Sequence, residues 1–325
     1  MKSELIPIIS IVIPVYNSEL YLKRCLDSVL SESLKSKEII IVNDMSTDHS
    51  EEIILQYAKH YCQIKYLTMK SKGFAGGSRN LALKTARGKY IGFLDSDDWV
   101  DTCMYKKIVS AMERSSADIG VCGVLREYES RYEVTHRYVY EIENVLEGRY
   151  AFDILCKRYN QDVSISSIVC NKVYRAEFLK RYELSFLVKN SNEDDVFNFI
   201  CFLNAAKVVI TPNTYYHYYQ RWNSITHSFS KKNLDDLIVA FATIKQYLVN
   251  NDIYKAFSNH FYSFFEKTFS FVLEMLITSE PNNIRQNEYI KYFISKCNCV
   301  FTISDYIEYF GAKRLRNILI DPTIR

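Results

Sequence analysis

Acidic side chains follow a short apolar run in the segment IGFLDSDDW, residues 91–99. Carboxylates beside Ile, Phe and Leu are costly to bury without partners, so Asp95, Asp97 and Asp98 are candidate binding residues. Two carboxylates two positions apart on a short loop suit Mg²⁺ or Mn²⁺, which take one or two of them together with substrate phosphates. The pattern also fits a simpler role, in which Asp97 or Asp98 caps a following helix.

Another carboxylate, Asp44, follows a second apolar run in the segment VNDMSTDHS, residues 42–50. Its position fits either an acceptor for an N–H group of a nucleotide base or a helix cap. Asp48 is expected to act only as a cap. The segment therefore adds a candidate base-binding residue to the acidic segment at residues 95–98.

Glycine is concentrated in the segment KSKGFAGGSRN, residues 70–80, which predicts a loop that a ligand approaches closely. A helix is expected from about residue 78 to residue 85, with Arg79 near its start. Because the helix dipole disfavours a cation at that end, Arg79 is expected to have a bound anion as its partner. The GxxxxGK[ST] spacing of a P-loop is absent.

The elements that must position these residues alternate between strands and helices. Apolar, β-branched runs predict buried strands, with Ser18 as the cap of the first helix and Ser46 or Asp48 as the cap of the second. The strands are expected at residues 8–15, 38–42, 64–68, 90–94 and 119–122, and the helices at 18–30, 46–61, 78–85 and 102–115. This alternation predicts an α/β fold with a mostly parallel sheet covered on both faces. Ligands bind at the carboxyl ends of such strands, where residues 16–17, 43–44 and 95–98 are all polar.

The rest of the chain predicts a less regular region followed by helices. The expected elements are a hairpin or edge strands at 125–140, a strand at 164–173, helices at 175–181 and 193–203, a strand at 208–210, a strand or ordered loop at 214–222, and long helices at 234–250, 254–277, 284–296 and 304–319. The change after about residue 228 predicts an all-helical C-terminal extension.

Composition excludes several classes of protein. A net charge of +3 over 325 residues is too weak to indicate a nucleic-acid partner. Nine cysteines without a CxxC pair indicate reduced thiols and a cytoplasmic location. The N-terminus does not fit a signal peptide, and no apolar run is long enough to predict a transmembrane helix.

In combination these segments resemble the family 2 glycosyltransferases, whose catalytic domain has the GT-A fold. The resemblance runs from about residue 9 to residue 226 and rests on ISIVIPVYN, EIIIVNDMSTD, GGSRNLALKTARGKYIGFLDSDDW, NKVYRAEFL and NEDDVF, in that order. Polymerising members often carry a QxxRW motif, whereas Gln220, Arg221 and Trp222 are contiguous here. The segment is instead similar to the Y-x-Y-x-x-R-x-x-SI pattern of members that add a single sugar.

The resemblance implies a UDP-sugar donor and a Mn²⁺ or Mg²⁺ cofactor. Asp97 of the DxD motif would bind the metal, Asp95 would contact the ribose or sugar, and Asp98 would support the loop or touch the donor sugar. Tyr16 would stack on the uracil ring, with Pro14 and Asp44 beside it. The other expected donor-binding residues are Asn17, Arg79, Ser96, Lys172 and Arg221.

The resemblance also implies inversion by a single in-line displacement with a general base. Asp194, in the acidic run Glu193-Asp194-Asp195, matches that base, with Asp195 as the alternative. Three acids also suit a helix N-terminus without any catalytic role. The residues expected to bind the acceptor are Glu193, Trp99 and Trp222. His217 would lie near the diphosphate or metal, unless it is a strand residue satisfied by a hydroxyl or a backbone carbonyl.

The expected activity is sugar transfer to a hydroxyl of a glycan or lipid-linked oligosaccharide in surface polysaccharide biosynthesis. Residues 1–124 would bind the nucleotide-sugar, residues 125–229 the acceptor, and residues 230–325 would form the helical extension. That extension would pack on the catalytic domain, form a homodimer or contact the inner face of a membrane. The alternatives are a nucleotidyltransferase of similar fold, a haloacid-dehalogenase-type phosphatase, or a non-catalytic nucleotide-sugar-binding protein. The phosphatase motif DxDx[TV] has Trp99 in its last place here.

Overall fold

The computed structural model describes residues 6–128, 134–157, 163–220 and 231–279, together with residues 288, 292, 295, 296 and 300. The chain divides into two compact units. The first comprises residues 1–155, 162–189 and 193–221, and the second comprises residues 156–161, 190–192 and 222–325. The division into segments 1–124, 125–229 and 230–325 stays a prediction.

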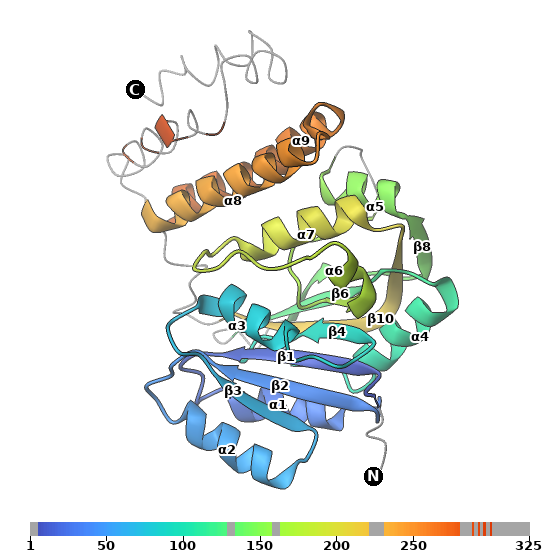
Figure 1. Ribbon diagram of the computed structural model, residues 1–325, viewed down its shortest axis with the longest axis vertical. Helices are drawn as coiled ribbons and strands as arrows, with labels where there is room; N and C mark the ends of the chain where they lie inside the picture. Colours follow the sequence, from blue (N-terminus) through green and yellow to red (C-terminus); the bar gives the residue numbers. More distant parts are fainter. Residues whose placement is uncertain are drawn as a thin grey trace. The chain divides into compact units, whose positions relative to one another are not determined.

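The first unit is built on a mixed sheet with a parallel core (Figure 1). Its order is β3 (Ile64–Thr68), β2 (Lys37–Asn43), β1 (Ile9–Val15), β4 (Tyr90–Phe93), β9 (Lys172–Arg175), β6 (Ile119–Tyr128), β10 (Lys207–Gln220) and β5 (Trp99–Val100). Strands β3, β2, β1 and β4 are parallel to one another, as are β6 and β10, whereas β9 and β5 run antiparallel to their neighbours. The predicted α/β class and mostly parallel sheet are confirmed.

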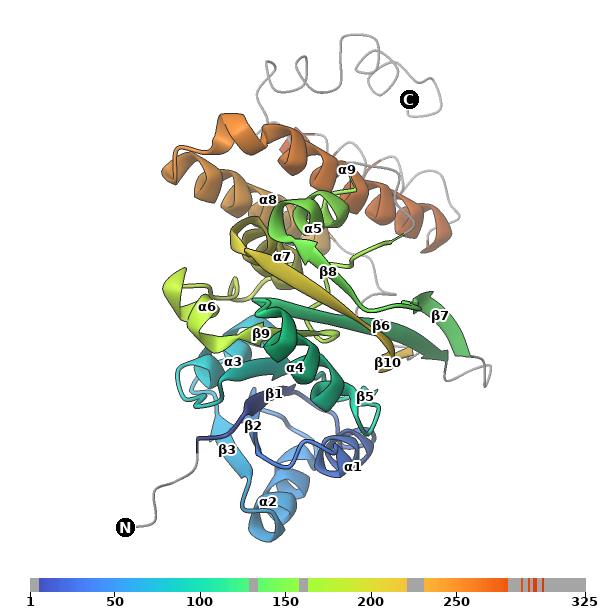
Figure 2. The same cartoon turned by 90° about the vertical axis from the view of Figure 1, so that its right-hand side faces the viewer.

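Two further strands extend the sheet, as Figure 2 shows. β7 (Val134–Tyr138) pairs with β6, and β8 (Asn144–Glu147) pairs with β10, both antiparallel. The β6–β7 pair confirms the hairpin or edge strands expected at residues 125–140. The strands expected at 208–210 and 214–222 are parts of the single strand β10, which changes register between Ile210 and Tyr215. Strands β5 and β8 were not predicted, because each is shorter than a recognisable apolar pattern.

Helices lie on both faces of the parallel strands (Figure 1). The helices of this unit are α1 (Leu22–Ser31), α2 (Ser50–His60), α3 (Phe74–Leu83), α4 (Met104–Ser115), α5 (Gly148–Leu155), α6 (Ala176–Arg181) and α7 (Glu193–Asn204). The central strand β1 is buried at all seven positions, including Ser10, whose hydroxyl donates to Glu38 Oε1 at 2.5 Å. A strand covered on both faces must be apolar along its whole length, which explains the sequence ISIVIPV.

Helix α3 begins at Phe74 rather than near residue 78, so Gly76 and Gly77 lie inside a helix and not in a loop. The reason is a cap supplied by a distant residue. The Asp44 carboxylate accepts hydrogen bonds from Gly73 N at 2.8 Å and Phe74 N at 2.9 Å. These bonds satisfy N–H groups that a helix start leaves without partners, and local sequence does not show them.

The cap expected at Ser18 is wrong. Helix α1 begins at Leu22, and the Ser18 hydroxyl donates to Tyr16 O at 3.2 Å and pairs with Ser96 Oγ at 2.6 Å. Asp48 does support the start of α2, because its Oδ1 accepts a hydrogen bond from Ser50 N at 3.0 Å.

The strand expected at residues 164–173 is also wrong, since β9 begins only at Lys172. The preceding residues form a turn, in which Lys172 N donates to Val169 O at 3.0 Å. The Asn171 side chain donates to Cys122 O at 2.7 Å. These internal bonds replace the ladder that a strand would have made.

The second unit contains α8 (Lys231–Asn250) and α9 (Tyr254–Ser279), as predicted. Phe241 of α8 packs against the rings of Phe261, Phe264 and Phe265 of α9, with centroid separations of 5.9, 6.0 and 4.9 Å. The helix expected at 284–296 lies largely outside the described residues, and the one at 304–319 lies wholly outside them.

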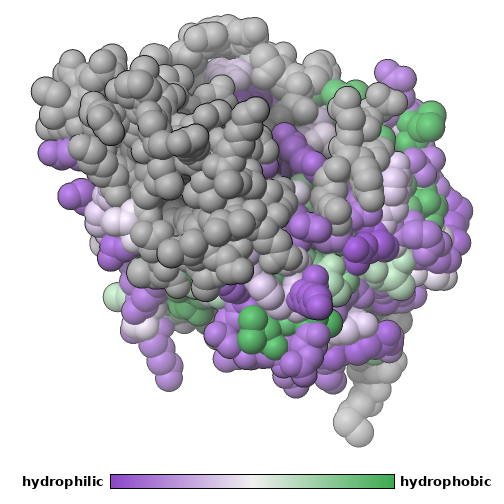
Figure 3. Space-filling view, turned by 90° about the horizontal axis from the view of Figure 1, so that it is seen from above, coloured by the Kyte–Doolittle hydropathy of each residue, from purple (hydrophilic) through white to green (hydrophobic). Residues whose placement is uncertain are grey.

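No helix in the described part of the chain is long and apolar enough to span a membrane. The coloured side chains in Figure 3 are mostly hydrophilic, with hydrophobic ones in small separate groups. The expected homodimer or membrane contact through the C-terminal helices stays a prediction.

Candidate active site

The carboxyl ends of three parallel strands meet at one edge of the sheet. β1 pairs with both β2 and β4 in parallel register, so the residues after each strand are neighbours. Asn17, which follows β1, accepts a hydrogen bond from Thr47 N at 2.8 Å through its side chain. The hydrogen bond between the Ser18 and Ser96 hydroxyls connects the segment after β1 to the segment after β4. The expected convergence of these polar segments is therefore confirmed.

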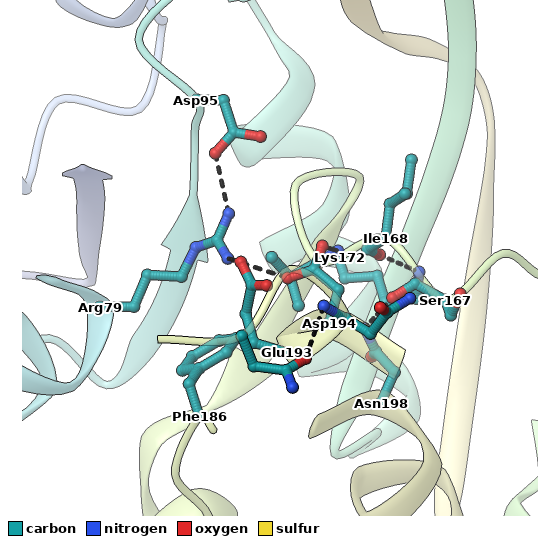
Figure 4. A network of polar contacts seen from close by, with 12 residues as sticks. Arg79, Asp95, Ser167, Ile168, Lys172, Phe186, Glu193, Asp194 and Asn198 are labelled. Carbon is teal, nitrogen blue, oxygen red and sulfur yellow. Dashed lines mark hydrogen bonds and ion pairs between the residues drawn. The ribbon is translucent and has the colours of Figure 1, made fainter. Parts of the chain in front are cut away.

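Arg79 of α3 lies at the centre of a network of three carboxyl groups (Figure 4). Its Nη2 contacts Asp95 at 2.8 Å, and its Nη1 contacts both Glu193 and Asp194 at 2.9 Å. The Arg79 side chain is only 3% exposed. The protein's own carboxyl groups thus supply anionic partners for Arg79. Its expected role in donor binding stays a prediction.

This network brings together residues that lie far apart in the sequence. Asp95 follows β4, whereas Glu193 and Asp194 open α7. Phe93 and Phe186 flank the guanidinium, with their ring centroids 5.9 and 5.3 Å from Arg79 Cζ. The guanidinium itself is buried, and charges interact more strongly where the local dielectric constant is low. The acidic run therefore has a tertiary role beyond that of a helix N-terminus.

The pKa values of the two carboxyl groups on α7 are raised. Burial, followed by the charge of Asp194, raises the pKa of Glu193 to about 8, although Arg79 opposes the shift. Burial also raises the pKa of Asp194, with Arg79 lowering it and Asp95 raising it. Glu193 therefore binds a proton more readily near neutral pH than an exposed glutamate does. A carboxylate with a raised pKa is a better proton acceptor near neutral pH.

Asp194 has a second fixed contact. Its Oδ2 accepts a hydrogen bond from Val169 N at 3.0 Å, while its Oδ1 faces Arg79. Its side chain remains 25% exposed, so the carboxylate is anchored on both oxygens and still open to a ligand. Asp195 lies in the same first turn of α7 and is partly exposed.

Asp98 is buried and linked to strand β10. Its Oδ1 accepts a hydrogen bond from Tyr219 N at 2.8 Å, and its Oδ2 accepts one from the Tyr216 hydroxyl. Burial raises the pKa of Asp98, and the charges of Asp97 and Asp95 raise it further. Of the two roles expected for Asp98, supporting the loop is the one with contacts in the structure.

Helix α1 holds the backbone of the acidic loop. Arg24 Nη2 donates to Asp97 O at 2.9 Å, and the Cys25 thiol donates to Asp95 O at 3.5 Å. The Arg24 guanidinium also lies over the Trp99 ring, 3.9 Å from its centroid. Sequence reasoning missed Arg24, because nothing in the pattern of α1 distinguishes it from a solvated helical arginine.

Carboxylates occupy both ring nitrogens of His217. Its Nδ1 lies 2.6 Å from Glu127 Oε1, and its Nε2 lies 3.0 Å from Asp101 Oδ1. Burial lowers the pKa of His217, but these two hydrogen bonds outweigh burial and raise it. Because both ring nitrogens are hydrogen-bonded to carboxylates, neither is free to bind a metal, so this arrangement favours the structural alternative over a metal ligand. The ring also stacks on partly exposed Trp99, with the ring centroids 5.1 Å apart.

The residues expected around a uracil ring lie at the same edge of the sheet. Tyr16 is 47% exposed, whereas Pro14 is buried in β1. Lys72 Nζ lies over the Tyr16 ring, 2.7 Å from its centroid. Asp44 is 3% exposed, and both of its carboxylate oxygens accept hydrogen bonds from the start of α3. Asp44 therefore caps a helix, as one of its two expected roles required, and that helix is α3. Its role in base binding stays a prediction.

Lys172 lies away from solvent. It is 0% exposed, and its Nζ donates to Ile168 O at 2.5 Å and to Asn171 Oδ1 at 2.9 Å. This placement is at odds with the donor-binding role expected for Lys172, because a fully buried ammonium is not available to a diphosphate. Arg221 and Trp222 lie outside the described residues.

A glycine in α3 allows α3 to approach the start of α7. A Cβ at position 76 would lie 2.3 Å from Leu187 O and 3.4 Å from Glu193 Cβ, whereas one at position 77 would meet only side-chain atoms of Met69 and Val188 at 3.4 and 3.5 Å. Gly76→Ala is therefore expected to lower the free energy of unfolding by about 1–3 kcal/mol. Gly77→Ala is the matched control and should stabilise the helix by up to about 1 kcal/mol. Urea unfolding measures both, and equal midpoints would refute the predicted clash.

Residues 10–183 match the family described as Glycosyl transferase family 2. The chain belongs to this family. The glycosyltransferase EpsJ of Bacillus subtilis is 32% identical over 233 residues, which cover 71% of this chain and 67% of EpsJ. The poly(ribitol-phosphate) beta-glucosyltransferase of Bacillus spizizenii is 33% identical over 221 residues, which cover 65% of this chain but only 32% of that protein.

Comparison with solved structures supports the GT-A fold of this family 2 glycosyltransferase. TarS of S. aureus, in complex with UDP, superposes with a TM-score of 0.71 at 20% sequence identity. The match covers 97% of this chain and 88% of the TarS chain. The expected family and fold are both confirmed.

Proposed function

We propose that this family 2 glycosyltransferase moves a sugar from a UDP-sugar to a hydroxyl of a glycan or lipid-linked acceptor, with inversion. The observation that carries the proposal is the Arg79 network, in which one buried guanidinium contacts both Asp95 of the DSD motif and Asp194 of α7. A donor-binding motif and a partly exposed carboxylate with a raised pKa are thereby held side by side. The relationship to a poly(ribitol-phosphate) glucosyltransferase supports an acceptor in surface polysaccharide biosynthesis.

In the proposed reaction Asp194 takes the proton of the acceptor hydroxyl as the oxygen attacks the anomeric carbon. Arg79 and Val169 N hold its two oxygens, so the carboxylate keeps one orientation as the proton arrives. A positioned general base typically raises the rate by about 10²–10⁴-fold. Attack opposite the leaving UDP inverts the anomeric centre.

On the donor side, exposed Tyr16 and Asn17 and buried Pro14 and Asp44 line the proposed nucleotide site at the ends of β1 and β2. An aromatic ring with one open face suits stacking on a planar base. TarS, which has the same fold, was crystallised with UDP. This supports the choice of a uridine nucleotide as the donor of the present chain.

The residues fit a divalent ion that is shared with the donor. The described residues contain no group of three or more His, Cys, Asp or Glu side chains that could hold a metal without a substrate. An ion that takes one or two carboxylates and completes its shell with substrate phosphates does not need such a group. Asp97 is partly exposed, and together with Asp95 it raises the pKa of buried Asp98, so the loop carries concentrated negative charge. When bound at Asp97, Mn²⁺ or Mg²⁺ would supply positive charge that neutralises the leaving UDP.

Release of UDP from a panel of UDP-sugars tests this proposal. With Mn²⁺ and an acceptor extract, one UDP-sugar is expected to give UDP, and EDTA should abolish the signal. Asp97→Asn should weaken binding of the Mn²⁺–UDP complex and lower turnover. Asp27→Asn is the matched control, because Asp27 is exposed on α1 and accepts a hydrogen bond from the Tyr57 hydroxyl, away from the acidic loop. Full activity in EDTA would contradict the metal. Pyrophosphate release from UTP and a sugar 1-phosphate would indicate a nucleotidyltransferase, and UDP binding without turnover would indicate a binding protein.

A further inference from the structure

A single peptide group lies between a buried lysine and the proposed base. The carbonyl of Ile168 accepts a hydrogen bond from Lys172 Nζ at 2.5 Å, and the N–H of Val169 donates to Asp194 Oδ2 at 3.0 Å. That carbonyl and that N–H belong to the same peptide bond. Figure 4 shows Lys172, Ile168 and Asp194 in this arrangement.

The burial of Lys172 requires an explanation. Lys172, Asn171 and Val169 are all 0% exposed. Removing an ammonium group from water costs several kcal/mol, and a lysine needed only for packing would be replaceable by an apolar residue. Burial raises the pKa values of the Cys122 and Cys201 thiols, and the charge of Lys172 lowers both. The lysine therefore places a positive charge inside the protein, next to the turn that contacts Asp194.

We propose that Lys172 is a positioning residue for the base, acting through the Ile168–Val169 peptide. A cation on a carbonyl oxygen pulls electron density along the peptide and makes its N–H a stronger donor, since linked hydrogen bonds polarise one another. The stronger N–H holds the ionised Asp194 carboxylate in place and favours that form. This inference rests on the proposed function, in which Asp194 is the base.

The turn around this peptide is fixed from two further directions. Asn198 Nδ2 donates to Ser167 O at 2.6 Å, and the Tyr174 hydroxyl donates to Asn198 Oδ1 at 2.7 Å. Asn198 lies on α7, the helix that carries Asp194, and Tyr174 lies on β9 beside Lys172. The peptide therefore cannot rotate away from Asp194 without breaking bonds at both ends of the turn.

Several other charged or titratable groups face Asp194 and remain unchanged when Lys172 is replaced. They are Arg79 from α3, Asp95 after β4, Glu193 and Asp195 from α7, the Cys170 thiol from the turn and the Tyr174 hydroxyl from β9. Asp95 and Glu193 are held by Arg79, not by Lys172. A change in the pH profile on replacing Lys172 therefore reports on the peptide link.

The test is the full-length Lys172→Met variant, assayed for kcat across pH and for UDP affinity by calorimetry. Loss of a charge-assisted link is expected to lower kcat about tenfold near neutral pH. The acidic limb of the kcat profile should move to higher pH, because ionised Asp194 is less stabilised and takes a proton more readily. UDP affinity should not change. A profile that coincides with that of the unmodified enzyme, or weakened UDP binding with an unshifted profile, would overturn the proposal.

Two more variants keep the test decisive. Asn198→Ala loosens the same turn at Ser167 O without removing a charge, and it should lower stability without moving the acidic limb. Lys172→Gln is neutral but retains an N–H donor, so it serves if Lys172→Met does not fold, and it should shift the limb in the same direction. An unshifted limb in folded Lys172→Gln overturns the proposal. If Asp194→Asn stays active, the base assignment itself has failed, whereas an inactive Asp194→Asn with an unshifted Lys172 variant refutes only the peptide link.

Discussion

Replacing Asp194 with Asn is expected to lower kcat by about 10²–10⁴-fold while leaving UDP affinity unchanged. The amide has the size of the carboxyl group and can still accept a hydrogen bond from Arg79, but it cannot take a proton from a hydroxyl. Asp194 touches the Arg79 guanidinium and Val169 N rather than any residue expected to bind the nucleotide base. Single-turnover assays with saturating donor, together with calorimetry of UDP binding, measure the two effects separately.

Asp195→Asn is the matched control for this prediction. It removes a carboxylate from the adjacent position in the same helical turn, and Asp195 is the alternative base. Transfer should persist in Asp195→Asn, with a pH profile like that of the unmodified enzyme. Loss of activity in Asp195→Asn combined with activity in Asp194→Asn would reverse the assignment.

The second large effect is expected for Arg79→Met. The side chain is 3% exposed and contacts Asp95, Glu193 and Asp194. Removing one partner of a buried ion pair typically costs about 3–5 kcal/mol, because the remaining charges stay buried without compensation. Arg79 lowers the pKa values of Glu193 and Asp194, so both should rise further in the variant. The base would then be protonated over a wider pH range, and transfer near neutral pH should be lost.

Arg114→Met is the control that separates burial from charge. Its Nη2 lies 2.6 Å from Glu143 Oε2, and the two side chains are 62% and 38% exposed. An exposed ion pair contributes at most about 1 kcal/mol, so Arg114→Met should differ little from the unmodified enzyme in stability and activity. Urea unfolding and UDP-release assays compare the two variants. Equal losses in both would mean that the Arg79 network has no special role.

Local patterns determined much of the fold of this family 2 glycosyltransferase. The runs that became β1, β2 and β4 are mostly apolar because strands buried on both faces need apolar residues. The edge strand β3 is buried only at Ile64. Once these strands are parallel, the polar residues after them must share one edge, and this is why Tyr16, Asp44 and Asp95 could be grouped in advance. The order of the motifs also indicated the family, which residues 10–183 confirm.

The partners of the charged residues were decided by tertiary structure alone. Arg79 meets Asp95 at a sequence separation of 16, but Glu193 and Asp194 at separations of 114 and 115. No local periodicity encodes such contacts, so Arg79 was assigned to a ligand. The start of α3 and the burial of Lys172 were misjudged for the same reason, since a distant carboxylate caps the helix and a turn encloses the lysine. The sequence by itself determined the parallel strands β1 to β4 and the acids at their ends, because both follow from neighbouring residues. The approach of α3 to the start of α7 and to the loop after β4 decided which acids pair with Arg79. Their pKa values follow from the same approach, because ionisation depends on burial and on charges brought close only by folding.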